Sequence, residues 1–292
     1  MKKRNVIFLA LVAAILFSIE GYAVFESKPM GARAIAMGGA YTALADDVSA
    51  IAYNPAGLSL IEDIEVNTFY TQLFGLSDLK QQLFSVAVPF SRYSKAKNPG
   101  TAGILYHSFG SDLLTEKTIT FAYGKNISED FMIGFNFNTY MLSIQDFGST
   151  SVFGLDVGFM SRVKRVRRHF GFGTFLKNFN APQVGKEFPK DLSRELSIGV
   201  SYTPYEGATT TIDFSKEMLV NATNIKVGQE FLIGKNLALR GGIQFDPNRF
   251  TVGFGTKIKN LKFDYSFYSH AILPATHLIS LSFKFPKGEK SK

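Results

Sequence analysis

The chain has 292 residues, a formal net charge of +8 and no cysteine, which allows one large or two small domains. The lack of cysteine excludes disulfides, thiolate metal sites, thiol catalysis and a lipid-modified N-terminal cysteine. Hydrophobic residues make up 46% of the chain and Phe occurs 29 times, yet the mean hydropathy is only +0.06. Apolar residues are therefore mixed with polar ones along the sequence.

Residues 1–23 are typical of an export signal. Residues 2–4 are basic, an apolar stretch runs from Val6 to Phe17, and small residues at Gly21 and Ala23 precede the expected cleavage after Ala23. A membrane anchor is the alternative, but the apolar stretch is short for a span. The mature chain stays basic, which can indicate nucleic acid. An exported protein seldom meets any, so we expect no nucleic-acid partner.

The exported part divides into two regions. Residues 24–62 are rich in Ala and Gly, with helix-compatible stretches at Ala32–Met37 and Asp46–Tyr53. From residue 63 to residue 285, apolar and polar residues alternate in runs separated by turn signals. In residues 131–138, for example, Phe and Ile at odd positions alternate with Met, Gly and Asn at even positions. Successive strand side chains face opposite sides, so each run has an apolar and a polar face.

About fourteen such runs are present. They lie near residues 64–71, 80–88, 102–109, 115–124, 131–141, 152–161, 170–178, 194–203, 209–216, 223–231, 237–245, 250–258, 261–268 and 276–285. A soluble β-sandwich also alternates, but its strands are usually shorter. An even number of long strands with one aromatic-rich and one Gly, Ser, Thr and Asn-rich face favours a closed membrane barrel.

The sequence therefore predicts an all-β protein, a transmembrane antiparallel β-barrel of about 14 strands with a short N-terminal, partly helical plug in the lumen. The expected divisions are a signal peptide at 1–23, a hatch or plug at 24–62, the barrel at 63–285 and a basic C-terminal tail at 286–292.

Residues 31–58 carry the most specific motif, GARAIAMGGAYTALADDVSAIAYNPAGL. This motif resembles the N-terminal region of the long-chain fatty-acid transporter (FadL-type) superfamily, especially its PorV/PorQ-like branch. The resemblance implies an outer-membrane barrel of a Gram-negative-type (diderm) bacterium with a hatch in the lumen. The hatch residues would be Gly31, Arg33, Gly38, Gly39, Asp46, Asp47, Asn54, Pro55 and Gly57.

The motif also has a purely structural interpretation. Gly38 and Gly39 allow positive φ or a close approach to the wall, Asn54 before Pro55 ends a helix, and Gly57 permits a turn into the first strand. Structural and ligand-binding roles both stay open. The chain departs from FadL-type transporters because it lacks long outer loops, and because Phe285, a possible assembly signal, is followed by the tail.

The sequence contains no motif that is typical of an enzyme. Four His residues occur, and none has metal-ligand spacing or a Glu partner in a known motif. His107 and Ser108 are adjacent and, in a strand, face opposite sides. We expect no catalytic residue, no metal and no cofactor, and therefore no enzyme.

A cluster of basic residues is expected at a periplasmic turn. It is formed by Arg162, Lys164, Arg165, Arg167 and Arg168. The cluster fits either a solvated turn or a contact with an acidic partner or lipid headgroups.

Three functions remain open. The leading hypothesis is a passive, hatch-gated conduit for small hydrophobic molecules, which predicts an apolar pocket inside the wall. The alternatives are a PorV-like accessory or shuttle barrel of a protein secretion system, with a sealed lumen, and a structural surface barrel. Expected partners are outer-membrane lipid, the barrel-assembly machinery during biogenesis, and either a hydrophobic small molecule or secretion-system proteins.

Overall fold

The computed structural model describes residue 25 and residues 28–94, 98–163, 169–185, 189–219 and 221–286. The expected signal peptide at residues 1–23 lies outside the described residues, as does the tail beyond Pro286. All structural statements below concern the described residues.

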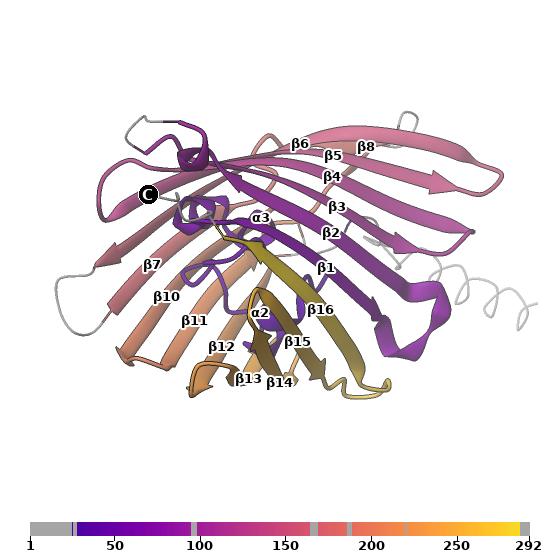
Figure 1. Ribbon diagram of the computed structural model, residues 1–292. Coiled ribbons are helices and arrows are strands. Elements are labelled where there is room, and N and C mark those ends of the chain that lie inside the picture. Colours follow the sequence, from indigo (N-terminus) through magenta and orange to yellow (C-terminus); the bar gives the residue numbers. More distant parts are fainter. Residues whose placement is uncertain are drawn as a thin grey trace, which may run out of the picture.

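In this described part of the chain, fourteen strands form one closed antiparallel barrel (Figure 1). They are β1 (Ile64–Gln72), β2 (Lys80–Pro89), β3 (Thr101–Gly110), β4 (Leu114–Asn126), β5 (Phe131–Ile144), β6 (Gly148–Val163), β7 (His169–Leu176), β10 (Glu195–Tyr205), β11 (Ala208–Glu217), β12 (Ala222–Ile233), β13 (Leu237–Phe245), β14 (Arg249–Ile258), β15 (Leu261–Tyr268) and β16 (Thr276–Phe285). Pairing of Ile64 with Phe285 and of Thr71 with Leu278 closes β1 on β16. The predicted fold class is confirmed.

The two faces of the wall differ as the alternation predicts. Along β5, Phe135 and Phe137 are exposed on the outer surface, whereas Asn136 and Asn138 are buried inside. The outer surface is therefore apolar and the lumen polar, which is the arrangement that a membrane-spanning barrel requires. Among the described helices, none is long and apolar enough to cross a bilayer.

The plug lies inside the barrel and consists of residues 28–62. Its short helices are α2 (Ala32–Ala36), α3 (Ala50–Tyr53) and the 3-10 helix η1 (Pro55–Leu60), and α2 packs against β14 and β15 (Figure 1). The second helix begins at Ala50, later than the predicted Asp46. Side chains explain the difference. The backbone N–H of Val48 donates to the Glu65 carboxylate and that of Ser49 donates to the Asp47 carboxylate. Such bonds from backbone to side chain compete with the backbone hydrogen bonds of a helix.

A belt of glycines lines the wall where the plug touches it. A β-carbon at any of these glycines would come within 3.0 Å of a plug atom: Gly103, Gly124, Gly134, Gly158, Gly173, Gly199, Gly228, Gly242 and Gly253. The register sets several of them side by side, since Gly134 pairs with both Gly124 and Gly158. The backbone of the plug therefore packs directly on the backbone of the wall.

The two ends of the barrel differ. We call the end where β1 begins and β16 ends the terminal end, and the opposite one the loop end. Three 3-10 turns connect strands, namely η2 (Leu73–Gly75) and η3 (Ser77–Leu79) at the loop end and η4 (Phe90–Arg92) at the terminal end.

The connection from β7 to β10, at the loop end, contains a small sheet of β8 (Gln183–Val184) and β9 (Lys190–Asp191) that the alternation did not predict. Strands of two residues are too short to show a period. Val184 and Leu192 from this connection form an apolar cluster with Phe25 and Tyr140. The connection therefore packs on the start of the plug instead of extending away from the barrel.

The glycine belt can be tested with two adjacent glycines of β13. A β-carbon on Gly242 would lie 2.2 Å from the backbone N of Gly38 in the plug, whereas on Gly241, which faces outward, the nearest atom is 3.8 Å away. We expect Gly242→Val to weaken plug docking by about 1–3 kcal/mol through overpacking. Trypsin cleavage after Arg33, followed by mass spectrometry, should become about tenfold faster, because such cleavage tracks local opening.

The matched control is Gly241→Val, which makes the same change to strand propensity without contacting the plug. Cleavage of this variant should proceed at the wild-type rate. Equal cleavage rates in the two valine variants would contradict direct packing of the plug on the belt.

Candidate functional site: the plug contacts and the lumen cavity

Arg33 of the plug lies at the centre of an ion network. Its Nη1 donates to Asp46 Oδ1 at 2.6 Å, to Asp47 Oδ2 at 3.0 Å and to the Tyr41 hydroxyl at 2.8 Å. Its Nη2 reaches Glu230 Oε1 of β12 at 3.1 Å. The motif residues Arg33, Asp46 and Asp47 are thus brought together, and the wall supplies the third carboxylate.

The network continues into the wall. Glu230 Oε2 accepts from Arg240 Nε at 2.6 Å, and Arg240 Nη1 donates to Asp264 Oδ1 at 2.7 Å. Arg240 is only 5% exposed, so its charge depends on these two carboxylates, because an unpaired buried charge is strongly destabilising. We call the set of Arg33, Asp46, Asp47, Glu230, Arg240 and Asp264 the latch.

Two residues of the latch, Arg33 and Asp47, form an ion pair within the plug itself. Burial alone would raise the pKa of Asp47, but the charge and hydrogen bond of Arg33 outweigh burial and hold this pKa well below its ordinary value. Asp47 is therefore a carboxylate at neutral pH, and the ion pair with Arg33 persists there.

Wall and plug side chains also satisfy backbone groups across the interface. Asp213 Oδ2 of β11 accepts the N–H groups of Tyr41 and Thr42, each at 2.8 Å. The amide of Asn54 donates to the carbonyls of Thr42 at 2.9 Å and Phe159 at 3.0 Å, and its Oδ1 accepts from Ala56 N at 3.2 Å. Asn54 therefore joins two plug segments to β6 and caps η1.

The motif glycines have two distinct roles. Gly31, Gly38 and Gly39 have φ of 83°, 66° and 75°, a region that favours glycine. Gly57 does not form the expected turn into β1, because it lies within η1, which begins at Pro55. A β-carbon there would lie 1.8 Å from Ala45 O, so close packing inside the plug is the reason for this glycine.

Only Arg162 of the predicted basic cluster lies within the described residues. Its Nη2 donates to Leu44 O of the plug at 2.6 Å and lies 3.8 Å from Asp46 Oδ2. Arg162 therefore contacts the plug. Lys164, Arg165, Arg167 and Arg168 lie outside the described residues.

The sequence did not single out the wall partners Asp213, Glu230, Arg240 and Asp264. They occupy inward positions of their strands. The sequence feature that could have pointed to them is a charged residue on the polar face of an alternating run. Their plug partners are far away in sequence, so the contact itself needs the closed barrel.

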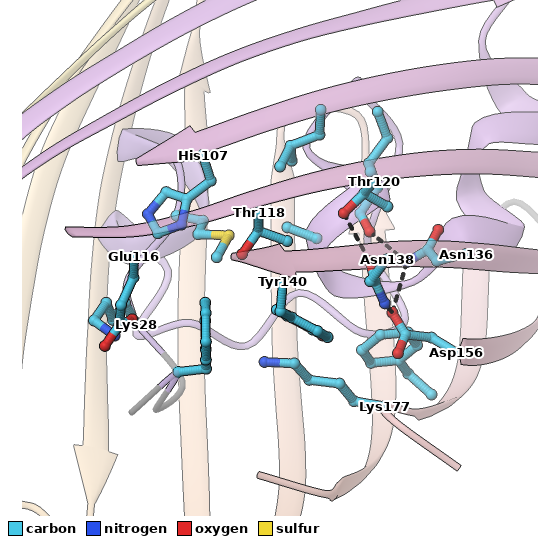
Figure 2. A pocket seen from close by; sticks show the side chains of 16 residues that line it. Lys28, His107, Glu116, Thr118, Thr120, Asn136, Asn138, Tyr140, Asp156 and Lys177 are labelled. Carbon is cyan, nitrogen blue, oxygen red and sulfur yellow. Dashed lines mark hydrogen bonds and ion pairs between the residues drawn. The ribbon is translucent and has the colours of Figure 1, made fainter. Parts of the chain in front are cut away.

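A cavity lies in the lumen between the plug and the loop end (Figure 2). It has an empty volume of about 540 Å³, including the space at its mouth. Apolar side chains from plug and wall form one part of its lining: Phe25, Met30, Ile51, Ala52, Leu105 and Phe175. Polar side chains form the rest: Lys28, His107, Glu116, Thr118, Thr120, Asn136, Asn138, Tyr140, Asp156 and Lys177. The cavity is therefore not the purely apolar pocket expected for a conduit.

No group of three or more His, Asp and Glu residues in the described part of the chain is arranged to hold a metal ion. His107 faces the cavity with Glu116 and Lys28 (Figure 2). The arrangement offers hydrogen bonds and charge to a bound molecule.

The two comparisons by sequence assign no function to the chain. A family model described as an uncharacterised protein family (UPF0164) matches residues 23–162, which span the plug and β1–β6. No curated protein matches the sequence. The PorV/PorQ-like branch stays a prediction from the motif.

The solved structures that are similar include two toluene transporters and a FadL homologue. The toluene transporter TodX of Pseudomonas putida has a TM-score of 0.64 and 11% identity, over 89% of this chain and 99% of that one. The toluene transporter TbuX of Ralstonia pickettii has a TM-score of 0.64 and 12% identity, over 90% and 100%. A FadL homologue of Pseudomonas aeruginosa has a TM-score of 0.57 and 10% identity, over 91% and 100%. The chain thus has the barrel fold of these proteins.

The latch predicts strong coupling between plug and wall. Replacing Arg33 with Met removes the cation that three carboxylates share, so plug docking should weaken by about 3 kcal/mol. Glu230→Gln should weaken it too, and the double variant should lose less than the sum of the two, because each change removes the same contact. Hydrogen exchange of residues 30–60 measures these losses, with Lys235→Met on an exposed turn as the unaffected control. Additive losses would show that the two residues act independently.

Proposed function

We propose that this protein is an outer-membrane barrel of a diderm bacterium that acts as a passive, plug-gated conduit for small hydrophobic molecules. The observation that carries the proposal is the plug itself, a short segment held inside a closed barrel by hydrogen bonds and ion pairs. Such contacts can exchange with water, so the plug can shift without unfolding of the barrel. In this proposal the protein carries out no reaction.

The outer surface supports a membrane location. Aromatic and aliphatic side chains cover it, among them Phe121, Phe159 and Phe214. A closed barrel leaves no unpaired strand edge in lipid. The export signal predicted at residues 1–23 and the fold shared with outer-membrane transporters point to the outer membrane.

The similar structures support the class of solute. TodX and TbuX are toluene transporters, and both have the barrel fold over nearly their whole length. Fold alone does not determine cargo, but a plugged barrel of this size with a lumen cavity provides the parts that a conduit needs. Small hydrophobic molecules are therefore the leading substrate class.

The proposed path has three stages. A solute enters at the loop end and reaches the cavity, whose lining includes Ile51 and Ala52 of α3. The plug then shifts, which breaks latch contacts such as Arg33 with Glu230. Release follows toward the terminal end, which would face the periplasm if both termini lie there. No energy source is required, since the solute moves down its gradient.

Uptake into vesicles tests the proposal. Folded protein is inserted into liposomes whose outer leaflet contains lipopolysaccharide, and uptake of the hydrophobic fluorescent probe N-phenyl-1-naphthylamine is followed. Wild-type protein should accelerate uptake over protein-free vesicles. Arg33→Met should accelerate it further, because the loosened plug opens more often, and Lys235→Met should match the wild type.

A variant lacking residues 31–57 gives a second measure of plug control. If it folds, as judged by protease resistance of the barrel, its uptake should exceed that of the wild type. Wild-type protein that is folded and gives no uptake above protein-free vesicles would reject the conduit and favour a sealed barrel.

A further inference from the structure

Three buried polar atoms, each on a residue that lines the cavity, lack a hydrogen-bond partner among the described residues. They are His107 Nε2, Glu116 Oε1 and Asn136 Oδ1. These residues are 4%, 2% and 3% exposed, respectively. A buried polar atom without a partner is destabilising, so the cavity is built to hold a molecule that forms hydrogen bonds.

The rest of each side chain is fixed in place. Glu116 Oε2 accepts from Lys28 Nζ at 2.6 Å. The Asn136 amide donates to Ile51 O of the plug at 2.9 Å and to Asp156 Oδ2 at 3.0 Å. The unpaired oxygens are therefore held in position, which reduces the entropy lost when a ligand binds.

The charges that line the cavity balance one another. Lys28 and Lys177 are the cations, and Glu116 and Asp156 are the anions. In Figure 2 the ammonium of Lys177 points into the cavity. An ionic ligand would add a buried charge that no further group offsets, and burying an unbalanced charge is costly. The cavity thus favours a ligand without charge.

Apolar side chains complete the cavity. Phe25 and Tyr140 meet edge to face with ring centroids 5.1 Å apart, and Phe175 and Leu105 also line it. A ligand that fills the cavity therefore needs an apolar body as well as a polar group.

We propose that the cavity binds small uncharged molecules that carry a hydroxyl group on an apolar body. The inference deepens the proposed conduit and rests on it, because it names the preferred substrate class. One hydroxyl donates to His107 Nε2, Glu116 Oε1 or Asn136 Oδ1 and accepts from the ammonium of Lys177. An unsubstituted hydrocarbon of the same shape leaves these groups without partners.

Displacement of water leads to the same preference. A cavity with free polar atoms holds water that bonds to them. A hydroxyl reproduces some of those bonds when it replaces the water, whereas a hydrocarbon forfeits them. Sites built to bind a hydroxyl discriminate strongly against analogues without it.

Toluene and p-cresol, which differ by one hydroxyl, are a matched pair of probes. Their binding to the full-length folded protein in lipid nanodiscs is measured by calorimetry, with empty nanodiscs to subtract partitioning into lipid. We expect p-cresol to bind at least about tenfold more tightly than toluene. Equal affinities would overturn the inference, and so would the absence of binding by both, which would mean that the cavity holds water alone.

Two substitutions locate the site. His107→Phe keeps a ring but removes the unpaired Nε2, and Lys177→Met removes the ammonium. Each should reduce the preference for p-cresol about threefold or more, and the double variant should abolish it. His277→Phe is the matched control, because His277 lies on β16, hydrogen-bonds to Tyr265 of β15 and does not line the cavity. A preference retained in the double variant would overturn the assignment to this cavity.

The binding assay is independent of transport. Selective p-cresol binding together with absent vesicle uptake would reject the conduit while the site stands. Uptake without selective binding would overturn the site while the conduit stands.

Discussion

Direct contact between the backbone of the plug and that of the barrel wall is the constraint on which the structure depends. Glycines such as Gly134 and Gly242 make the contact possible, since a β-carbon at either would collide with the plug. Such close contact brings plug N–H groups into the lumen wall, where they need acceptors. The wall supplies them: Asp213 accepts from Tyr41 and Thr42. Glycine and polar residues therefore recur together on the inner face.

The latch follows from the same constraint. Apolar plug residues such as Met37, Ile51 and Leu58 pack against the wall, but apolar packing is non-directional. Ion pairs across the interface add directional contacts, and Arg33 reaches the wall only when the plug is in one position relative to β12. Buried ion pairs often contribute little net stability against apolar packing. Their value here is positional, since they fix where the plug lies against the wall.

The sequence predicted the barrel closely, because each strand separates polar from apolar residues with a period of two. The predicted run at 237–245 coincides with β13 (Leu237–Phe245). Interactions between distant residues were not predictable: Arg33 and Glu230 are 197 positions apart, and their contact needs strand register and barrel closure. The later start of α3 at Ala50 and the packing role of Gly57 likewise depend on neighbours that a local pattern does not contain.

His107 shows that the lining of the cavity comes together only when the barrel closes. In sequence it is a lone histidine beside Ser108, with no partner at motif spacing. In the closed barrel it lies on β3 and pairs with Thr118 of β4, two residues from Glu116, and all three residues line the cavity. The similar transporters share the fold at 11–12% identity, so their lumen side chains need not be the same. The barrel wall requires the alternation of faces, and inward positions outside the glycine belt and the latch are less constrained by the fold. In the proposed conduit, the polar groups that line the cavity are therefore the part of the barrel that would set its selectivity.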